Sequence, residues 1–426
     1  MNSEQLLTRA FELDSTDDLA HWRDRFVIDD PDLSYLDGNS LGMLPRTTVH
    51  RLHEVMNEEW GSGLIRSWRK WLELPLIVGN ELAPLLGADD GEVVVHDSTS
   101  VNLHQLLHAA VRLRPSRSCI AIDAHEFPTD RYAVESVAAQ HGLTVVSPGP
   151  NERLEELDLG DCAVVVRSLI DYRSAEVADL SGFTSRARDA GALVIWDLSH
   201  AVGAIELDLH AAQVDLAIGC TYKFLNGGPG APAFSYVRSN LIEEVDQPIR
   251  GWFGQDDQFA MDGAWSPKPG IGRLMIGTPS ILALEAARCG IELCAEAGMP
   301  SIAAKGRALT DFAHECCDEL NLESISPRDS SKRGAHIAVR HPHAKDVVER
   351  LERECSVIAD YRDPDLVGSD VLHSRRGLVT SRALSSNSQE SPTIGRSRLA
   401  GERSCDTNRS TISNMHLAFV DQFDEV

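Results

Sequence analysis

The sequence predicts an α/β fold in which helices cover a mostly parallel sheet, with a smaller α+β domain beside it. Between residues 92 and 240, short apolar runs alternate with helical segments, which implies crossover connections between parallel strands. The runs are apolar throughout, as expected for strands that are covered on both faces. The chain has 426 residues, and this length suits one large domain with a smaller satellite.

Each element follows from its local pattern. The expected strands span 92–96, 120–122, 144–146, 163–167, 193–196, 216–218 and 233–237. The expected helices span 3–26, 46–60, 102–112, 181–190, the long apolar stretch 279–297, and 344–352. Outside the main sheet, 35–42 predicts a short strand that breaks into a glycine turn, and 335–339 predicts a strand of the second α+β region.

The composition indicates which binding partners and which cellular compartment to expect. The formal net charge of −25 argues against nucleic acid and anionic membranes as partners. No apolar run reaches the roughly 18 residues of a transmembrane helix, and the polar N-terminus does not resemble a signal peptide. The nine cysteines include no C-x-x-C pair, which predicts reduced thiols in a cytoplasmic protein. No metal-site spacing or nucleotide-phosphate loop is present.

Two neighbouring predicted strands end in residues of opposite charge. Asp197 follows the run 193–196, His200 comes three residues later, and Lys223 follows the next run at a tight glycine turn. A lysine amine can form a Schiff base with the aldehyde of pyridoxal phosphate (PLP). A carboxylate can keep the pyridine nitrogen protonated, so that the ring withdraws electrons. A lone lysine would indicate only a surface residue, but this ordered set predicts a PLP site.

Other polar residues follow strand ends, the edge at which such sheets bind ligands. Thr99 and Ser100 lie between the first run and its helix, where hydroxyls and backbone N–H groups suit a phosphate. Helix capping alone would also explain them. Asp130 and Ser168 follow the second and fourth runs, and a turn or cap role is the alternative for Asp130.

With these residues assembled, the chain resembles the kynureninase family of fold-type I PLP enzymes from about residue 34 to residue 366. The motifs that carry the resemblance are YLDGNSLG (35–42), WGSGLIRSW (60–68), SVNLH (100–104), FPTD (127–130), WDLSHA (196–201), YKFLNGGPG (222–230) and GWFG (251–254). The resemblance implies a PLP-dependent transferase-like fold with a seven-stranded sheet in the large domain.

The resemblance also implies roles around the cofactor. Lys223 would bind PLP and later carry the substrate Cα proton, Asp197 would pair with the pyridine nitrogen, and Phe127 would stack on the ring. The other implied cofactor contacts are Thr99, Ser100, Pro128, Thr129, Asp130, Ser168, His200 and Tyr222, with Trp252 and Thr278 supplied by the second subunit of a homodimer. Asp197 as a helix cap, His200 as a structural group and Trp252 as a core or interface residue are the simpler alternatives.

The implied reaction is hydrolytic cleavage of the Cβ–Cγ bond of L-kynurenine to anthranilate and L-alanine, within tryptophan catabolism and NAD biosynthesis. Tyr222 is the expected general acid/base. Asn39 and Ser40 are expected near the substrate. Trp60 and Thr278 occupy places that bear on the aryl ring, where Trp with Thr rather than Asn favours kynurenine over 3-hydroxykynurenine.

The pattern departs from the family after Val367. There Gly368-Ser369-Asp370 replaces a segment resembling Arg-Phe-Gly, whose arginine grips the substrate carboxylate. One lost nucleotide would produce this change, so we hypothesise a frameshifted tail whose Ser/Arg-rich composition predicts disorder. Arg375 or Arg376 could replace the arginine only by chance. The expected domains are 1–45 as an N-terminal segment largely of the small domain, 46–300 as the PLP-binding domain, 301–367 as an incomplete small domain, and 368–426 as the aberrant tail.

Two alternatives to an active kynureninase follow. One is a PLP-binding but catalytically impaired remnant, because the arginine segment is missing. The other is a related PLP lyase or transaminase, such as a cysteine desulfurase-like enzyme, which would need a dedicated catalytic cysteine in a mobile loop. None of the nine cysteines has that sequence context.

Overall fold

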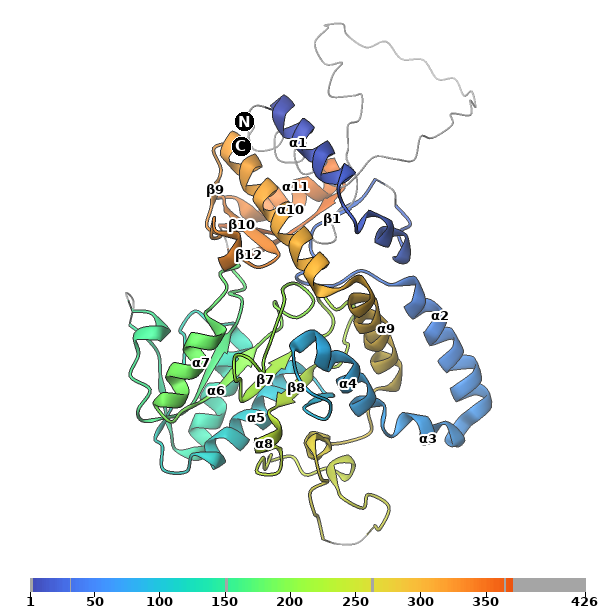
Figure 1. Cartoon of the computed structure of the whole chain (residues 1–426), viewed down its shortest axis with the longest axis vertical. Helices are drawn as coiled ribbons and strands as arrows, with labels where there is room; N and C mark the ends of the chain where they lie inside the picture. The colour runs from blue at the N-terminus through green and yellow to red at the C-terminus, as the bar shows by residue number, and fades with distance from the viewer. Residues whose placement is uncertain (1–2, 31, 150–151, 262–263, 364, 371–426) are drawn as a thin grey trace, which may run out of the picture.

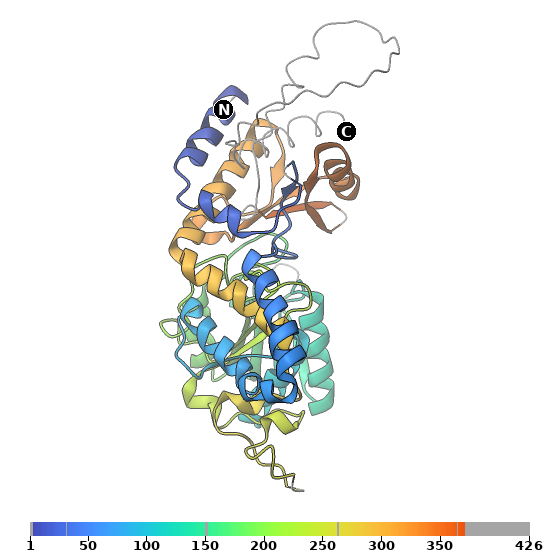
Figure 2. The same cartoon turned by 90° about the vertical axis from the view of Figure 1, so that its right-hand side faces the viewer.

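The computed structural model describes residues 3–30, 32–149, 152–261, 264–363 and 365–370. A larger α/β part carries most of the chain, and a smaller part that includes both α1 (Ser3–Ser15) and α10 (Met299–Glu319) is stacked on it (Figures 1 and 2). The helix α9 (Ile281–Ala297) runs into α10 and leads the chain from the larger part to the smaller one (Figure 1).

The larger part is built on a sheet of seven strands in the order β2-β8-β7-β6-β5-β3-β4. Their bounds are β2 Val93–Val95, β3 Cys119–Ile122, β4 Thr144–Val146, β5 Cys162–Ser168, β6 Leu193–Asp197, β7 Leu216–Gly219 and β8 Phe234–Val237. All seven apolar runs therefore form strands, and the predicted α/β class is confirmed. Strand β8 alone runs antiparallel to its neighbours. The link from β7 contains no crossover helix that would carry the chain back to the starting end of the sheet, so the next strand runs in the opposite direction.

Helices cover both faces of this sheet. The helices α4 (Leu74–Leu86), α7 (Leu180–Asp189) and α9 pack on one face, whereas α5 (Thr99–Leu113) and α6 (Pro128–His141) pack on the other. Strand β6 shows why its run is apolar throughout. Trp196 contributes to one core cluster and Ile195 to the other, since successive side chains of a strand point to opposite faces.

The smaller part contains segments from both the N-terminal and the C-terminal regions of the described chain. A four-stranded sheet has the order β12-β13-β10-β9, and α1 packs on α10 through a core that includes Leu6 and Phe312. The bounds are β9 Glu323–Ser324, β10 His336–Arg340, α11 Ala344–Cys355, β12 Asp360–Asp363 and β13 Leu366–Asp370, with β1 Ser34–Tyr35 paired to β11 Val357–Ile358.

The predicted N-terminal helix is shorter than expected. It ends at Ser15, and a separate 3₁₀ turn spans Ala20–Arg25. The hydroxyls of Ser15 and Thr16 donate to the Glu12 carbonyl, and Asp17 accepts from the Leu19 N–H, so local side-chain hydrogen bonds replace the next helical turn.

Shorter elements complete the described chain. They are α2 Arg46–Glu54, a π-helix Val55–Gly63, α3 Trp68–Trp71, α8 Ser239–Ile242 and 3₁₀ turns at Leu64–Ser67, Leu154–Glu156, Trp252–Gly254, Ile271–Leu274 and Ser330–Lys332. None of the described helices is both long enough and apolar enough to cross a bilayer.

The predicted break after Val367 falls inside a strand. Gly368, Ser369 and Asp370 continue β13, which pairs with β10 through Asp370 and with β12 through Gly368. Backbone hydrogen bonds make this pairing, so it does not require the side chains that the family pattern would place there. The rest of the predicted tail, 371–426, lies outside the described residues.

Candidate active site

The strongest candidate site is a cavity of about 330 Å³ at the carboxyl ends of the parallel strands β5, β6 and β7. Ten of the predicted site residues line it: Thr99, Ser100, Phe127, Thr129, Asp130, Ser168, Asp197, His200, Tyr222 and Lys223. Six lining residues were not predicted: Asp97, Ser98, Tyr172, Ser199, Gly230 and Ala231. Residues from distant segments meet here because parallel strands end at one edge of the sheet.

Lys223 lies on the tight turn that follows β7. The turn is held by hydrogen bonds from the Asn226 N–H to the Lys223 carbonyl (2.9 Å) and from the Gly227 N–H to the Thr221 carbonyl (2.9 Å). Asn226 has φ +55°, a left-handed conformation that this compact turn requires. The lysine side chain is buried, and burial lowers the pKa of its amine. A lowered pKa favours the neutral amine, which is the nucleophilic form.

His200 is the closest polar partner of this amine. Its Nε2 lies 2.8 Å from Lys223 Nζ. Burial, followed by the positive charge of Lys223, holds the pKa of His200 well below its usual value. The imidazole is therefore neutral and can accept a proton or a hydrogen bond from the amine. Its ring centroid lies 5.9 Å from that of His336 on β10, so the smaller part of the molecule reaches this side of the site.

Two carboxyl groups, those of Asp130 and Asp197, also line the cavity. Asp197 ends β6, and its Oδ1 accepts a hydrogen bond from the Ser199 N–H (2.7 Å). Burial raises the pKa of Asp197. Asp130 is also buried, its Oδ2 has no hydrogen-bond partner, and burial with the charges of Asp197 and Glu126 raises its pKa well above the usual range. A cationic or protonated group placed here would relieve the repulsion among these carboxyls.

Glu126 is a buried residue beside the site that the sequence reasoning did not single out. Its carboxylate accepts from Ser168 Oγ (2.5 Å), from the Ser168 N–H (2.9 Å) and from the Phe127 N–H (3.1 Å). One carboxylate therefore holds both Ser168 and Phe127, two of the predicted site residues. The motif FPTD begins one residue later, but no sequence signal shows that the preceding acid turns inward rather than toward solvent.

The N-terminus of α5 provides the predicted anion site. Ser98 is the N-cap, and its Oγ accepts from the Val101 N–H (3.4 Å). Capping therefore accounts for Ser98 and not for Thr99 or Ser100, whose hydroxyls make no hydrogen bond to any described residue. Both line the cavity at the positive end of a 15-residue helix, which favours a phosphate there.

Some predicted residues lie elsewhere in this single chain. Pro128 is the first residue of α6 and does not line the cavity. Trp60 and Trp252 are 60% and 42% exposed, and Thr278 is exposed as well. Trp60 borders a separate hollow of about 450 Å³ with Leu64, Ile65 and Leu282 among its lining residues.

Asn39 and Ser40 do not line the cavity, but their loop contacts its lysine turn. The Gly42 N–H donates to the Tyr222 carbonyl (2.8 Å), and a Cβ atom at Gly42 would lie 2.2 Å from the Lys223 carbonyl oxygen. Ser40 Oγ accepts from Arg362 Nη2 (2.9 Å) and donates to Asp360 Oδ2 (3.0 Å). Arg362 thus approaches the site from β12, and the sequence reasoning did not predict it.

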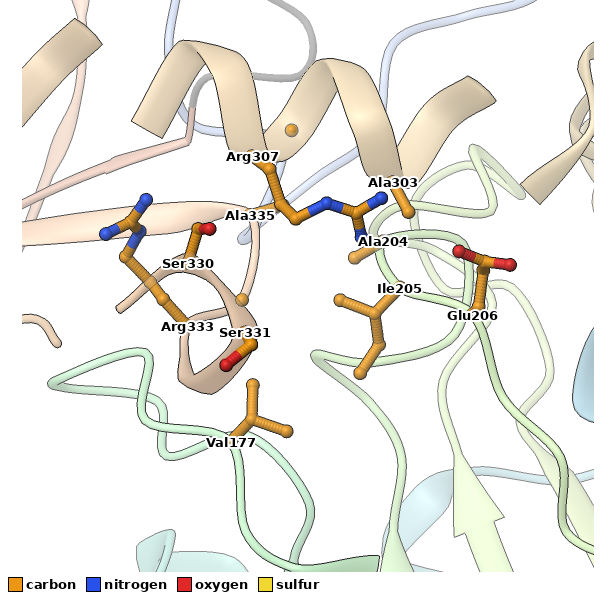
Figure 3. A pocket seen from close by; sticks show the side chains of 12 residues that line it. Val177, Ala204, Ile205, Glu206, Ala303, Arg307, Ser330, Ser331, Arg333 and Ala335 are labelled. Atoms are coloured by element: carbon orange, nitrogen blue, oxygen red, sulfur yellow. The ribbon is translucent and has the colours of Figure 1, made fainter. Parts of the chain in front are cut away.

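A second cavity, of about 240 Å³, lies between the two parts of the molecule (Figure 3). Arg307 reaches toward Ala204 and Ile205, with Glu206 nearby. Arg333 also lines it, but its guanidinium is occupied by Asp311 and Thr310. This cavity has no lysine among its lining residues, so it lacks the nucleophile that distinguishes the first.

Known proteins resemble the chain in sequence. Residues 302–368 match the family described as Kynureninase C-terminal domain. Three curated relatives carry the name Kynureninase. The relative from Pseudomonas fluorescens is 42% identical, with 83% of this chain and 88% of that protein covered. Those from Deinococcus radiodurans and Burkholderia pseudomallei are 40% and 39% identical, covering 83% and 84% of this chain and 88% of each relative.

Solved structures resemble it in fold. The apo cysteine desulfurase from Thermococcus onnurineus NA1 has a TM-score of 0.69 at 18% identity, covering 84% of this chain and 92% of that one. The cysteine desulfurase CsdA from Escherichia coli has a TM-score of 0.71 at 18% identity, covering 82% and 92%. A C-DES variant with glycine covalently linked to the PLP cofactor has a TM-score of 0.69 at 15% identity, covering 80% and 92%. At these identities the likeness concerns the fold, and it confirms the predicted fold type.

Proposed function

Because this chain belongs to the kynureninase family, we propose that it hydrolyses L-kynurenine to anthranilate and L-alanine with PLP as cofactor. The observation that carries the proposal is the cavity in which the buried amine of Lys223 and the buried carboxyl of Asp197 meet. This reaction would place the protein in tryptophan catabolism, upstream of NAD biosynthesis.

The residues present fit PLP. Lys223 offers a buried amine for the aldehyde, and the acidic side formed by Asp197 and Asp130 suits a protonated ring nitrogen. Thr99 and Ser100 at the helix N-terminus suit the phosphate. When bound, the cofactor would act as an electron sink that makes the substrate Cα proton acidic.

The chain's own residues would then handle protons. Lys223 would take the Cα proton, and neutral His200 at 2.8 Å would accept a hydrogen bond from its amine. Burial raises the pKa of Tyr222, so its hydroxyl is protonated at neutral pH. In this form Tyr222 can donate to the substrate γ-carbonyl as a general acid, whereas a role as general base would require proton loss after substrate binds.

A second copy of the chain would complete the site in the proposed cytoplasmic homodimer. Trp60, Leu64, Ile65, Trp252 and Phe259 are large apolar side chains left exposed on one protomer. Such side chains are typical of a protein interface when they gather on a surface. We assign Trp252 and Thr278 of the second copy to the cofactor, and Trp60 with Thr278 to the aryl ring, where they would favour kynurenine over 3-hydroxykynurenine.

The described cysteines give no support to a desulfurase-like activity. Seven of the eight are buried, and Cys355 is partly buried. Burial raises the pKa of Cys220, Cys294 and Cys316, which keeps their thiols protonated. A reactive cysteine needs an accessible thiolate with a lowered pKa. An impaired remnant would bind PLP without turning over L-kynurenine, so a measurement of both binding and turnover distinguishes it from an active enzyme.

The test is a titration of the purified chain with PLP, followed by L-kynurenine with anthranilate fluorescence as the readout. Bound-cofactor absorbance together with anthranilate release supports the proposal. Bound cofactor without anthranilate indicates the impaired remnant. Absence of both would contradict the assignment of the cavity to PLP, provided that circular dichroism shows a folded chain.

A further inference from the structure

The cavity of about 240 Å³ between the two parts of the molecule is separate from the active-site cavity, since the two have no lining residue in common. The larger part contributes Val177 and the segment 204–206 to its walls. The smaller part contributes one face of α10 and residues of the segment 330–335. A molecule bound in this cavity would therefore contact both parts at once (Figure 3).

The face of α10 that borders the cavity combines two small residues with one long cation. Ala303 and Gly306 leave open space, and Arg307 follows one turn after Ala303, so it shares their face of the helix. The guanidinium of Arg307 reaches toward Ala204 and Ile205 (Figure 3). It makes no hydrogen bond or ion pair with any residue that the structure describes, so its charge is available to a ligand.

The other arginine that lines the cavity is already occupied. Arg333 is buried, and its guanidinium pairs with Asp311. The same guanidinium donates to Thr310 Oγ1 (2.9 Å) and to the Pro327 carbonyl (2.6 Å). Of these two arginines, only Arg307 therefore lacks a partner within the described part of the chain.

An acid approaches the same cavity from the larger part. Glu206 lies near Arg307, but the two side chains form no ion pair, and the carboxylate has no other partner among residues 3–370 that the structure describes (Figure 3). A simple anion would be attracted by Arg307 and repelled by Glu206, and a simple cation the reverse. The two charges together match a ligand that carries a carboxylate and an ammonium group.

Most of the remaining lining is aliphatic, with side chains from Val177, Ala204, Ile205, Ala303 and Ala335. Ala204 and Ala335 form a core cluster with Phe224, so this wall is held in place by packing across the two parts. An apolar wall with a small number of charged groups is typical of a small-molecule site. This wall suits an aliphatic group on the ligand.

We propose that this cavity binds a free α-amino acid with an aliphatic side chain. Arg307 holds the carboxylate of this ligand, because the planar fork of a guanidinium can bind both carboxylate oxygens. Glu206 holds its ammonium group, and Val177 and Ile205 contact its side chain. The site is distinct from the active site and does not depend on the proposed reaction. Since Arg307 and Glu206 belong to different parts of the molecule, the bound amino acid joins the two parts.

The test uses the PLP-loaded chain after borohydride reduction, which fixes the cofactor to its lysine so that the amine of a probe cannot react with it. Isothermal titration calorimetry compares L-leucine with 4-methylpentanoate and 3-methylbutylamine, which each lack one of its charges. Wild type should bind L-leucine about tenfold more tightly than either analogue. R307Q should lose the preference over the amine, and E206Q should lose the preference over the carboxylate. The control R353Q, on the exposed side of α11, should match wild type.

A303L gives a second test that changes no charge. Its larger side chain takes the space of the ligand, so L-leucine binding should be lost while urea denaturation shows a folded chain. Arg307 and Glu206 have no described partner to lose, so R307Q and E206Q should also stay folded. A preference for L-leucine that persists in R307Q and in A303L belongs to another cavity and overturns the inference. Equal binding of all three probes by wild type, or no binding of L-leucine, overturns it as well.

Discussion

Lys223 Nζ lies 2.8 Å from His200 Nε2, and both residues are buried in the cavity that also contains Asp197. The pKa of each is lowered, with burial as the largest cause, so the cavity disfavours the charged form of both groups. An amine whose pKa is lowered and whose neighbour is an imidazole rather than a carboxylate gives up its proton more easily than one in a strong ion pair. This pairing explains how one lysine could both bind a cofactor and carry a substrate proton.

Replacing Lys223 by Met should abolish turnover. The side chain keeps a similar length but loses the amine, so the cofactor has no covalent attachment and the Cα proton has no acceptor. We expect anthranilate release to fall by about 10³-fold or more. Mass spectrometry after borohydride reduction should show the PLP mass on wild type and not on K223M. The control is K345M, because Lys345 is exposed on α11; equal labelling of K223M and wild type would contradict the assignment.

Asp130→Asn should stabilise the cofactor-free chain at neutral pH. The folded-state pKa of Asp130 is raised by burial and by Asp197 and Glu126, so its stabilising contribution exists at low pH. This contribution is lost as the pH rises from about 4, the usual value, through the raised pKa. We expect D130N to gain about 1–3 kcal/mol in the free energy of unfolding at pH 8 and little at pH 4.

Urea denaturation at several pH values measures this effect, with D189N on the exposed end of α7 as the control. If the free energy of unfolding of D130N depends on pH in the same way as that of wild type, then burial and repulsion at Asp130 do not limit the stability of the chain. The affinity of D130N for PLP should fall although its stability rises, since the cavity would have lost one carboxyl.

Glu126→Ala should loosen Ser168 and Phe127 together. The substitution leaves the Ser168 N–H and Oγ and the Phe127 N–H without their acceptor, and we expect about 2–4 kcal/mol of lost stability. PLP affinity should fall about tenfold, because the residue expected to stack on the ring is no longer held. The matched control is E135A, on the exposed face of α6. If E126A binds PLP as wild type does, Glu126 has only a structural role.

The sequence predicted the sheet and the grouping of the site well, for a physical reason. Strands that are buried on both faces are apolar throughout, which made six of the seven runs visible, whereas the edge strand β4 is largely exposed. The ends of parallel strands also share one edge of the sheet. The direction of β8 was not predictable from its run, because an apolar segment has no direction. It depends on the link between β7 and β8, which contains no helix.

The parts of the site that sequence reasoning missed depend on tertiary contacts. Glu126 looks like any loop acid until the fold turns it toward Ser168. Arg362 lies 139 residues after Lys223, and only the position of the smaller part of the molecule brings it to Ser40. No local pattern contains that information.

Mixed dimers offer the sharpest test of a site shared between two copies. K223M lacks the amine in its own cavity, while W252A lacks the exposed indole that we assign to the neighbouring cavity. If each cavity takes Lys223 from one copy and Trp252 from the other, each variant alone should have low activity. Their heterodimer would contain one cavity with both defects and one with neither, since each copy contributes to both.

Mixing the two variants after partial denaturation should therefore restore up to about one quarter of wild-type activity, because half of the dimers are mixed and each has one intact site. Size-exclusion chromatography with light scattering would first establish a dimer. Mixing K223M with an affinity-tagged K345M, which keeps Trp252, serves as the exchange control, and co-purification of K223M with the tag measures the exchange, since the activity of this mixture is half that of wild type in either case. If K223M and W252A regain nothing while that control exchanges subunits, Trp252 serves the cavity of its own chain or none, and its 42% exposure needs another explanation.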